Sequence, residues 1–237
     1  MKVFRRSVER DWRDTELEQA RLWRRYPHPN LIRILHAVVG SNGPMALVFP
    51  FCRETLQRRF EHYCGIFPLS TSHTLMEHLA LGLNHMHMHG VLHRDVKPSN
   101  CLLHSSTLTP VILVICDFGW CKSVGVGHST ETPGAQTPMY RAPEVELGLT
   151  YGPSADTWAV GVMYRELLTG VQLWRIFRGD TALQYAERIV GAIDSDLVFL
   201  RPLCQRVDPE PWRPSRPRVP CRLSVGRTAC AAFQSQA

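Results

Sequence analysis

Two segments of the chain carry apolar residues at the spacing of an amphipathic helix, residues 12–25 and 71–89. In the first, Asp14 or Thr15 stands near the cap position, and glutamates follow in the early turns, where they complement the helix dipole. The second segment ends before Gly90, a natural stop for a helix. Its large apolar residues share one stripe: Leu75, Leu79, Leu83 and Met86. Both segments are therefore predicted to be helices.

Short apolar runs between turn-forming residues predict strands. These runs are residues 31–35, 46–49, 101–103 and 110–115. The prolines at positions 27 and 29 push their preceding residues toward extended geometry, which ends the first helix and begins the first of these strands. The last two runs flank a polar stretch and predict a hairpin with its turn at 104–109.

Composition indicates a globular, intracellular protein whose cysteines are reduced. The chain has 237 residues, 44% of them hydrophobic, which is enough for one large or two small domains. Its net charge of +6 comes mostly from scattered arginines, without the interleaved aromatic residues of a nucleic-acid platform, so no nucleic-acid partner is expected. The eight cysteines form no CxxC pair, which predicts free thiols in the cytoplasm or nucleus. No apolar run is long enough to span a membrane.

Two short stretches carry the chemistry of phosphoryl transfer. Residues 93–100 read His-Arg-Asp-Val-Lys-Pro-Ser-Asn, and residues 117–119 read Asp-Phe-Gly. Phosphoryl transfer needs a carboxylate to orient and deprotonate a hydroxyl, a cation near the moving phosphate, and oxygen ligands for Mg²⁺. The residues that supply these groups are Asp95, Lys97, Asn100 and Asp117. Each residue type is also common in turns and caps, but such local roles do not explain all four in this order.

The full pattern resembles the catalytic and metal-binding loops of the protein kinases. The resemblance implies an α+β, bilobal fold, with a β-rich N-lobe over residues 1–50 and a mainly helical C-lobe over 53–216. Residues 217–237 are rich in Pro, Arg and small residues without periodicity, so a mostly disordered tail is expected there. The chain starts inside what resembles the third kinase strand, so the N-lobe is expected to be truncated and its glycine-rich loop is absent.

In the N-lobe, the resemblance implies that Lys2 holds the phosphates of ATP and that a glutamate of the first helix holds Lys2. Glu18 is the predicted partner because Leu22 follows it at the family spacing; Glu16, or a merely solvated glutamate at this position, remains an alternative. Phe51 and Cys52 are implied to form the hinge between the lobes, where Cys52 would meet the adenine through its backbone.

The segment after Gly119 resembles a kinase activation segment. It ends in Tyr-Arg-Ala-Pro-Glu at 140–144, which resembles the cyclin-dependent and MAP kinases. By this alignment Thr132 is an activating phosphorylation site, or an unmodified loop threonine, and Arg94 would hold its phosphate. Further downstream the resemblance implies structural roles. Asp156 would accept hydrogen bonds from catalytic-loop amides, at the start of a helix that runs to Leu168, and Arg213 would pair with Glu144.

The resemblance therefore implies a protein serine/threonine kinase that uses ATP and Mg²⁺ as its cofactors. Asp95 would be the base, Lys97 would steady the phosphate, and Asn100 and Asp117 would bind Mg²⁺. Arg141 suggests, as a hypothesis, a preference for proline after the acceptor. The implied partners are a protein substrate and an activating subunit or upstream kinase, with no membrane. The absent glycine-rich loop leaves two alternatives: a pseudokinase scaffold, or an inactive fragment of a kinase.

Overall fold

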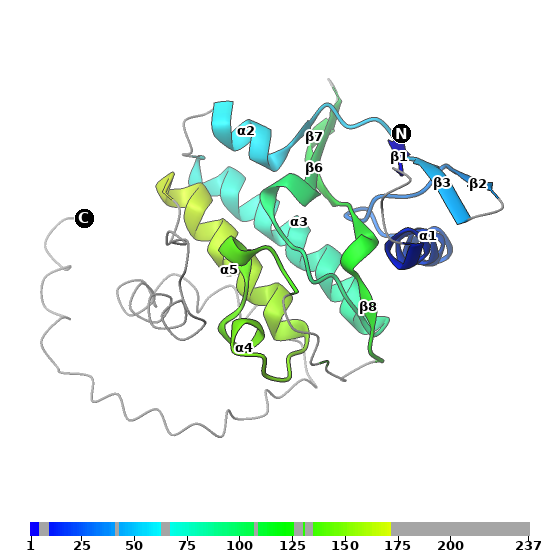
Figure 1. The fold of residues 1–237 in the computed structure, drawn as a ribbon. Coiled ribbons are helices and arrows are strands. Elements are labelled where there is room, and N and C mark those ends of the chain that lie inside the picture. The colour runs from blue at the N-terminus through cyan, green and yellow to red at the C-terminus, as the bar shows by residue number, and fades with distance from the viewer. Residues whose placement is uncertain are drawn as a thin grey trace, which may run out of the picture.

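The computed structural model describes residues 1–4, 10–40, 43–62, 67–106, 109–125, 130 and 135–171. These residues form a small lobe with a sheet and one helix, beside a larger and mainly helical lobe (Figure 1). The predicted α+β, bilobal class is therefore confirmed. Thr132, Arg213 and the predicted tail at 217–237 lie outside the described residues.

The small lobe joins three antiparallel strands to one long helix. The strands β1 (Lys2–Val3), β3 (Gly43–Val48) and β2 (His36–Gly40) are ordered β1-β3-β2. Helix α1 (Arg10–Arg25) packs against this sheet. Their shared core consists of Leu17, Ala20, Ile34 and Leu47. The helix and strand predicted at 12–25 and 46–49 are therefore confirmed.

One predicted strand begins later than expected. At 31–35 only Leu31 forms a bridge, to Ile115 of the other lobe, and β2 starts at His36. Ile32 donates a backbone hydrogen bond to the Ile115 carbonyl, and Ile115 donates one to the Asn30 carbonyl. Leu31 and Ile32 therefore link the two lobes. Ile34 packs in the small-lobe core, and Leu35 N donates to the Val48 carbonyl of β3.

The large lobe is built on two packed helices, α3 (Leu69–Met88) and α5 (Pro153–Thr169). The four stripe residues predicted for the helix at 71–89 are all buried in its core. The antiparallel hairpin of β6 (Cys101–Ser106) and β7 (Thr109–Ile115) confirms the predicted hairpin and contacts α3. Helix α5 ends before Gly170, whose φ of 69° is the left-handed conformation that glycine adopts easily.

Shorter elements surround this core. Strand β4 (Glu54–Thr55) pairs with β6 and leads into α2 (Leu56–His62). Strand β5 (Val91–Leu92) precedes the loop that carries Asp95 and pairs with β8 (Lys122–Ser123). The remaining elements are the 3₁₀ helices η1 (Pro98–Asn100), η2 (Phe118–Trp120) and η3 (Pro138–Tyr140), and helix α4 (Pro143–Glu146).

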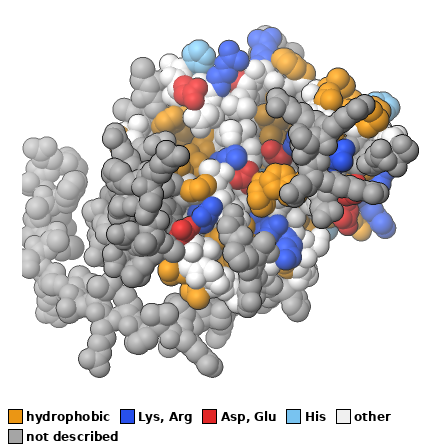
Figure 2. Space-filling model, viewed as in Figure 1, with side chains coloured by type: hydrophobic (Ala, Val, Ile, Leu, Met, Phe, Trp, Pro, Cys, Tyr) orange, Lys and Arg blue, Asp and Glu red, His pale blue; other side chains and the backbone are white. Residues whose placement is uncertain are grey.

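The surface mixes charges of both signs. Figure 2 shows Lys and Arg side chains beside Asp and Glu on this face, with no single basic patch among the coloured residues. No helix within the described ranges has the length and apolar character needed to cross a membrane.

Candidate active site

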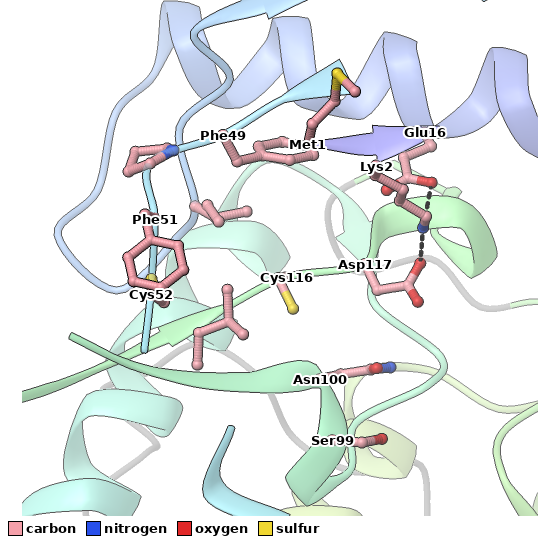
Figure 3. A pocket seen from close by; sticks show the side chains of 13 residues that line it. Met1, Lys2, Glu16, Phe49, Phe51, Cys52, Ser99, Asn100, Cys116 and Asp117 are labelled. Atoms are coloured by element: carbon pink, nitrogen blue, oxygen red, sulfur yellow. Dashed lines mark hydrogen bonds and ion pairs between the residues drawn. The ribbon is translucent and has the colours of Figure 1, made fainter. Parts of the chain in front are cut away.

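A pocket of about 360 Å³ lies between the small-lobe sheet and the loops of the large lobe. Six of the predicted site residues line it (Figure 3), namely Lys2, Phe51, Cys52, Asn100, Asp117 and, from the alternatives, Glu16. Residues from both lobes therefore converge on one cavity, although they are up to 115 positions apart in the sequence.

Lys2 joins two carboxylates at one end of this pocket. Its Nζ donates to Glu16 Oε2 at 2.6 Å and to Asp117 Oδ1 at 2.8 Å (Figure 3). Strand β1, helix α1 and the loop before η2 each contribute one of the three groups. The ammonium group thus connects the two lobes through its ion pairs.

Burial and charge act in opposite directions on these groups. Burial opposes the charged form of Lys2, but the two carboxylates outweigh it and raise the pKa of the ammonium. Burial also opposes ionisation of Asp117, yet the Lys2 charge holds the pKa of that carboxyl below its ordinary value. For the Glu16 carboxyl the effect of burial is larger than that of the Lys2 charge, so the pKa of Glu16 is raised. The Lys2 and Asp117 pair is therefore the one that favours full ionisation.

The prediction of Glu18 as the partner of Lys2 is wrong. Glu18 is exposed, whereas Glu16 is only 2% exposed and forms the ion pair. The cause is helical phase, because two positions rotate a side chain by about 200°. The buried face of α1 contains Glu16, Ala20 and Trp23, at the spacing i, i+4, i+7, so Glu18 lies away from it.

Asp95 lies at the centre of a second cluster, with both carboxylate oxygens engaged. Asn100 Nδ2 donates to Asp95 Oδ2 at 2.9 Å and to the Asp95 carbonyl at 2.8 Å. Lys97 Nζ lies 2.8 Å from the same Oδ2. The Thr137 hydroxyl donates to Asp95 Oδ1 at 2.6 Å and accepts from Lys97 Nζ at 2.9 Å. The three predicted residues are therefore brought together.

Asp156 holds the backbone of the loop that carries Asp95. Its Oδ2 accepts from His93 N and its Oδ1 accepts from Arg94 N, both at 2.9 Å, as predicted. His87 Nε2 also bonds to Oδ2 at 2.8 Å. Burial alone would raise the pKa of this carboxyl, but the bond and charge of His87, with those of His93, lower it. The buried carboxylate thereby satisfies two amides that have no strand partner.

Arg94 and Asp117 both have left-handed backbones, with φ of 63° and 67°. Such non-glycine residues are strained and persist where their surroundings fix them. The Arg94 guanidinium is fixed by the Trp120 carbonyl, which accepts from Nε at 2.7 Å, and by the Tyr151 hydroxyl at 3.3 Å. The phosphate predicted to meet Arg94 would sit on Thr132, outside the described residues.

Asn100 and Asp117 present a donor set that fits Mg²⁺. Both hydrogens of the Asn100 amide point to Asp95, so its oxygen Oδ1 is the atom that can ligate a cation. Asp117 uses Oδ1 for Lys2, which leaves Oδ2 for the same purpose. Mg²⁺ in nucleotide sites needs only one or two such protein oxygens, with phosphates and water supplying the rest. Within the described ranges, no group of three His, Cys, Asp or Glu residues is arranged to hold a metal.

The predicted hinge residues, Phe51 and Cys52, line the opposite end of the pocket (Figure 3). The Phe51 side chain is 81% exposed, and Cys52 is half-buried. Burial raises the pKa of the Cys52 thiol, and it raises that of Cys116, which lines the same pocket, to about 12. Both cysteines are therefore protonated, apolar lining at neutral pH.

The sequence motifs miss two groups of the site, and one predicted pair extends beyond the described residues. The motif at 140–144 assigns no role to Thr137, although the position of Thr137 directly before the Pro-Met-Tyr-Arg run could have suggested one. His87 gave no signal, because its contact with Asp156 joins residues 69 positions apart. Glu144 accepts from Ser154 Oγ at 3.4 Å, but its predicted partner Arg213 lies outside the described residues.

Comparisons with known proteins agree with this geometry. The model of the protein kinase domain matches residues 1–205. Mouse cyclin-dependent kinase-like 4 is 36% identical over 163 residues, which are 68% of this chain and 46% of that protein. Cell division control protein 2 homolog 3 of Trypanosoma brucei brucei is 32% identical over 170 residues, or 71% of this chain and 52% of that protein. The chain thus spans about half the length of these relatives. It belongs to the protein kinase family, as its motifs predicted.

Proposed function

We propose that this protein is a serine/threonine kinase that transfers the γ-phosphate of ATP to protein hydroxyls. The observation that carries this proposal is the convergence of two clusters. One joins Asp95, Lys97 and Asn100, and the other joins Lys2 to Asp117. Asn100 and Asp117 line the same pocket, so the hydroxyl-activating and nucleotide-binding groups share one site.

The contacts of Thr137 support the assignment of Asp95 as the base. A hydroxyl already lies 2.6 Å from Asp95 Oδ1 and 2.9 Å from Lys97 Nζ, which is the environment that a substrate hydroxyl needs. Asp95 would accept the hydroxyl proton, and Lys97 would stabilise negative charge on the phosphate. Lys2 would bind nucleotide phosphates while Glu16 keeps it in place. Mg²⁺, held by Asn100 and Asp117, would neutralise phosphate charge.

Nucleotide binding by the full chain tests this proposal. Purified protein is titrated with ATP in the presence of Mg²⁺ or EDTA while its thermal unfolding is followed. We expect a rise in Tm that requires Mg²⁺ and that disappears in Asp117→Asn. The control is Glu18→Gln, an exposed change on the neighbouring face of α1 that should leave the shift intact. A cooperative unfolding transition with no response to Mg²⁺ and ATP would contradict the proposal and favour a pseudokinase scaffold.

The backbone near Thr137 supports the finer proposal of proline after the acceptor. Gln136 has a left-handed φ of 66°, and its carbonyl accepts from Arg141 Nη2 at 3.1 Å. Its side chain is also fixed, because Nε2 donates to the Ala155 carbonyl and Oε1 accepts from Ala142 N. A carbonyl engaged by Arg141 is a poor acceptor for a substrate amide. Proline lacks that amide hydrogen, so it leaves no donor unsatisfied.

Paired peptides test this preference. A Ser-Pro peptide and its Ser-Ala counterpart are compared by kcat/KM. An unsatisfied amide costs about 1–3 kcal/mol, so the preference for Ser-Pro should be at least about fivefold. It should shrink in Arg141→Gln, which releases the carbonyl. Equal rates for the two wild-type reactions would reject the preference and leave the kinase proposal standing.

The buried position of Arg94 supports regulation by phosphorylation of Thr132. The Arg94 guanidinium contacts the Trp120 carbonyl at the start of the activation segment and Tyr151 beyond its end, so a nearby phosphate would add an anion to a buried cation. An upstream kinase would supply this phosphate. Mass spectrometry should find phosphate on Thr132 in the active form, and Thr132→Ala should lower activity. Full activity of Thr132→Ala would reject this mode of regulation.

A further inference from the structure

Three side chains on one face of α1 lie near the segment that contains η2. Trp12, Glu16 and Trp23 have the spacing i, i+4, i+11, which places them on one face of the helix. Trp12 contacts Trp120, Glu16 is joined through Lys2 to Asp117, and Trp23 lies near Phe118. The ion pair that defines the nucleotide site is thus flanked by an aromatic contact on each side.

The outer contact is the tighter of the two aromatic pairs. The ring centroids of Trp12 and Trp120 are 4.2 Å apart with the planes at 60°, whereas those of Trp23 and Phe118 are 6.3 Å apart. Trp12 remains 38% exposed, so it is not part of the central core. An edge-on indole pair at this distance adds attraction beyond its area of burial.

The backbone beside Trp120 ties this pair to both halves of the site. The Trp120 carbonyl accepts from Arg94 Nε at 2.7 Å, next to the loop that carries Asp95. A Cβ added to Gly119 would lie 3.7 Å from Glu16 Oε2 and from Asp117 Oδ1, and 4.0 Å from the Trp12 carbonyl. Gly119 of η2 therefore lies in contact distance of the carboxylates that bind Lys2 and of the backbone of α1.

We propose that Trp12 and Trp120 are positioning residues that hold α1 against η2, so that Glu16 stays within reach of Lys2. The inference rests on the proposed kinase function, because positioning matters only if Lys2 binds a nucleotide. The ion pair needs such support, since burial of the Glu16 carboxylate opposes its charged form. Trp12 lies one turn before Glu16, so a contact that fixes its ring also fixes the rotation of the helix.

Hydrogen exchange of the full chain tests this coupling without any need for activity. Trp120→Ala is compared with wild type for the exchange of amides in α1, which does not contain Trp120. We expect exchange in α1 to become about twofold to tenfold faster, the range that corresponds to an aromatic pair, while exchange in α3 stays unchanged. Trp12→Ala should have the same effect on η2, and Trp12→Phe should largely restore the wild-type rate.

Tyr26→Ala is the matched control. Tyr26 follows α1, is 39% exposed against 38% for Trp12, and contacts His89 rather than Trp120. It should leave exchange in η2 unchanged. Unaltered exchange of α1 in Trp120→Ala, or an equal effect of Tyr26→Ala on η2, would overturn the proposal. Global unfolding of a variant is recognised by faster exchange in α3. In that case the far-ultraviolet exciton signal of the indole pair decides the outcome: wild type should show it and Trp12→Phe should lose it. Absence of the signal from wild type would overturn the proposal.

Affinity for Mg²⁺ and ATP gives the functional test. Trp120→Ala should raise the Kd by about twofold to tenfold, because a smaller fraction of molecules has Glu16 in place. In a Glu16→Gln background the same change should have little further effect, since the pair has no carboxylate left to position. Additive effects would overturn the positioning role. Absence of binding by wild type would instead reject the proposed function, and the exchange experiment would still decide whether the tryptophans couple the two elements.

Discussion

The two sides of the pocket are held in different ways. In the large lobe, Asp95 lies on a loop whose amides bond to Asp156, a carboxylate that is 1% exposed on a helix of the core. In the small lobe, Lys2 is fixed through its ion pairs, and its side chain is 40% exposed. Val38, on the outer strand β2 of the same sheet, is half exposed.

This difference indicates how the site is divided. The groups that would handle the acceptor hydroxyl are fixed by buried hydrogen bonds within one core. The groups that would bind the nucleotide depend on contacts that cross between lobes, namely the pair of Lys2 with Asp117 and the Trp12 contact with Trp120. Mutations in the large lobe should therefore affect stability first, and those in the small lobe should affect nucleotide affinity first.

The largest expected effect comes from Asp156→Ala. It removes the acceptor for His93 N and Arg94 N and leaves two buried amides unsatisfied. We expect a loss of about 3–5 kcal/mol in the free energy of unfolding, measured by urea denaturation. Glu18→Ala, an exposed acidic residue, should change it by no more than about 0.5 kcal/mol. A loss below about 1 kcal/mol in Asp156→Ala would mean that this carboxylate does not hold the loop.

Truncation of a buried side chain in the large lobe should cost more stability than truncation of an exposed side chain in the small sheet. Leu79 of α3 is fully buried, and Val38 of β2 is 50% exposed. Leu79→Ala should cost about 2–5 kcal/mol of unfolding free energy, because it leaves a cavity, and Val38→Ala about 0.5 kcal/mol or less. Equal losses would contradict the burial of Leu79 and the exposure of Val38.

Ionisation of Glu166 in α5 should make the stability of the large lobe depend on pH. Burial raises the pKa of this carboxyl to about 7, from an ordinary value of 4.5, and Tyr140 donates to its Oε2 at 3.0 Å. The folded state then keeps a proton that the unfolded state loses. The stability that this group contributes is complete below pH 4.5 and is lost as the pH rises through about 7.

Glu166→Gln removes this titration. Between about pH 5 and pH 8, wild type should lose about 2–3 kcal/mol of unfolding free energy relative to Glu166→Gln. Urea denaturation of both proteins at the two pH values measures the difference. Parallel changes in the two proteins would show that Glu166 ionises normally in the folded state.

Glu16→Gln and Glu18→Gln form a matched pair on one helix. Glu16→Gln weakens the hold on Lys2 and should raise the Kd for ATP by roughly tenfold, the value of one hydrogen bond to a charged group. Glu18→Gln should leave it unchanged. A titration of ATP binding with Mg²⁺ present measures both. The reverse order of effects would restore Glu18 as the partner of Lys2.

The sequence predicted most reliably where local pattern and chemistry coincide. The contiguous motif around Asp95 and the stripe of α3 needed only short-range information. The prediction of Glu18 failed because residue spacing alone does not identify which face of the helix packs against the sheet. The contacts of His87 with Asp156 and of Trp12 with Trp120 join distant segments, so only the folded chain brings them together.

Transfer of the γ-phosphate by Asp95→Asn is the sharpest test of the proposed kinase mechanism. Asp95 bonds to Asn100, Lys97 and Thr137 but is not among the residues that line the pocket between the lobes. We expect that the full chain phosphorylates a Ser-Pro peptide with Mg²⁺ and ATP, and that Asp95→Asn loses at least about 100-fold in kcat while ATP affinity changes little. Transfer at the wild-type rate in Asp95→Asn would contradict the assignment of the base and with it the proposed mechanism.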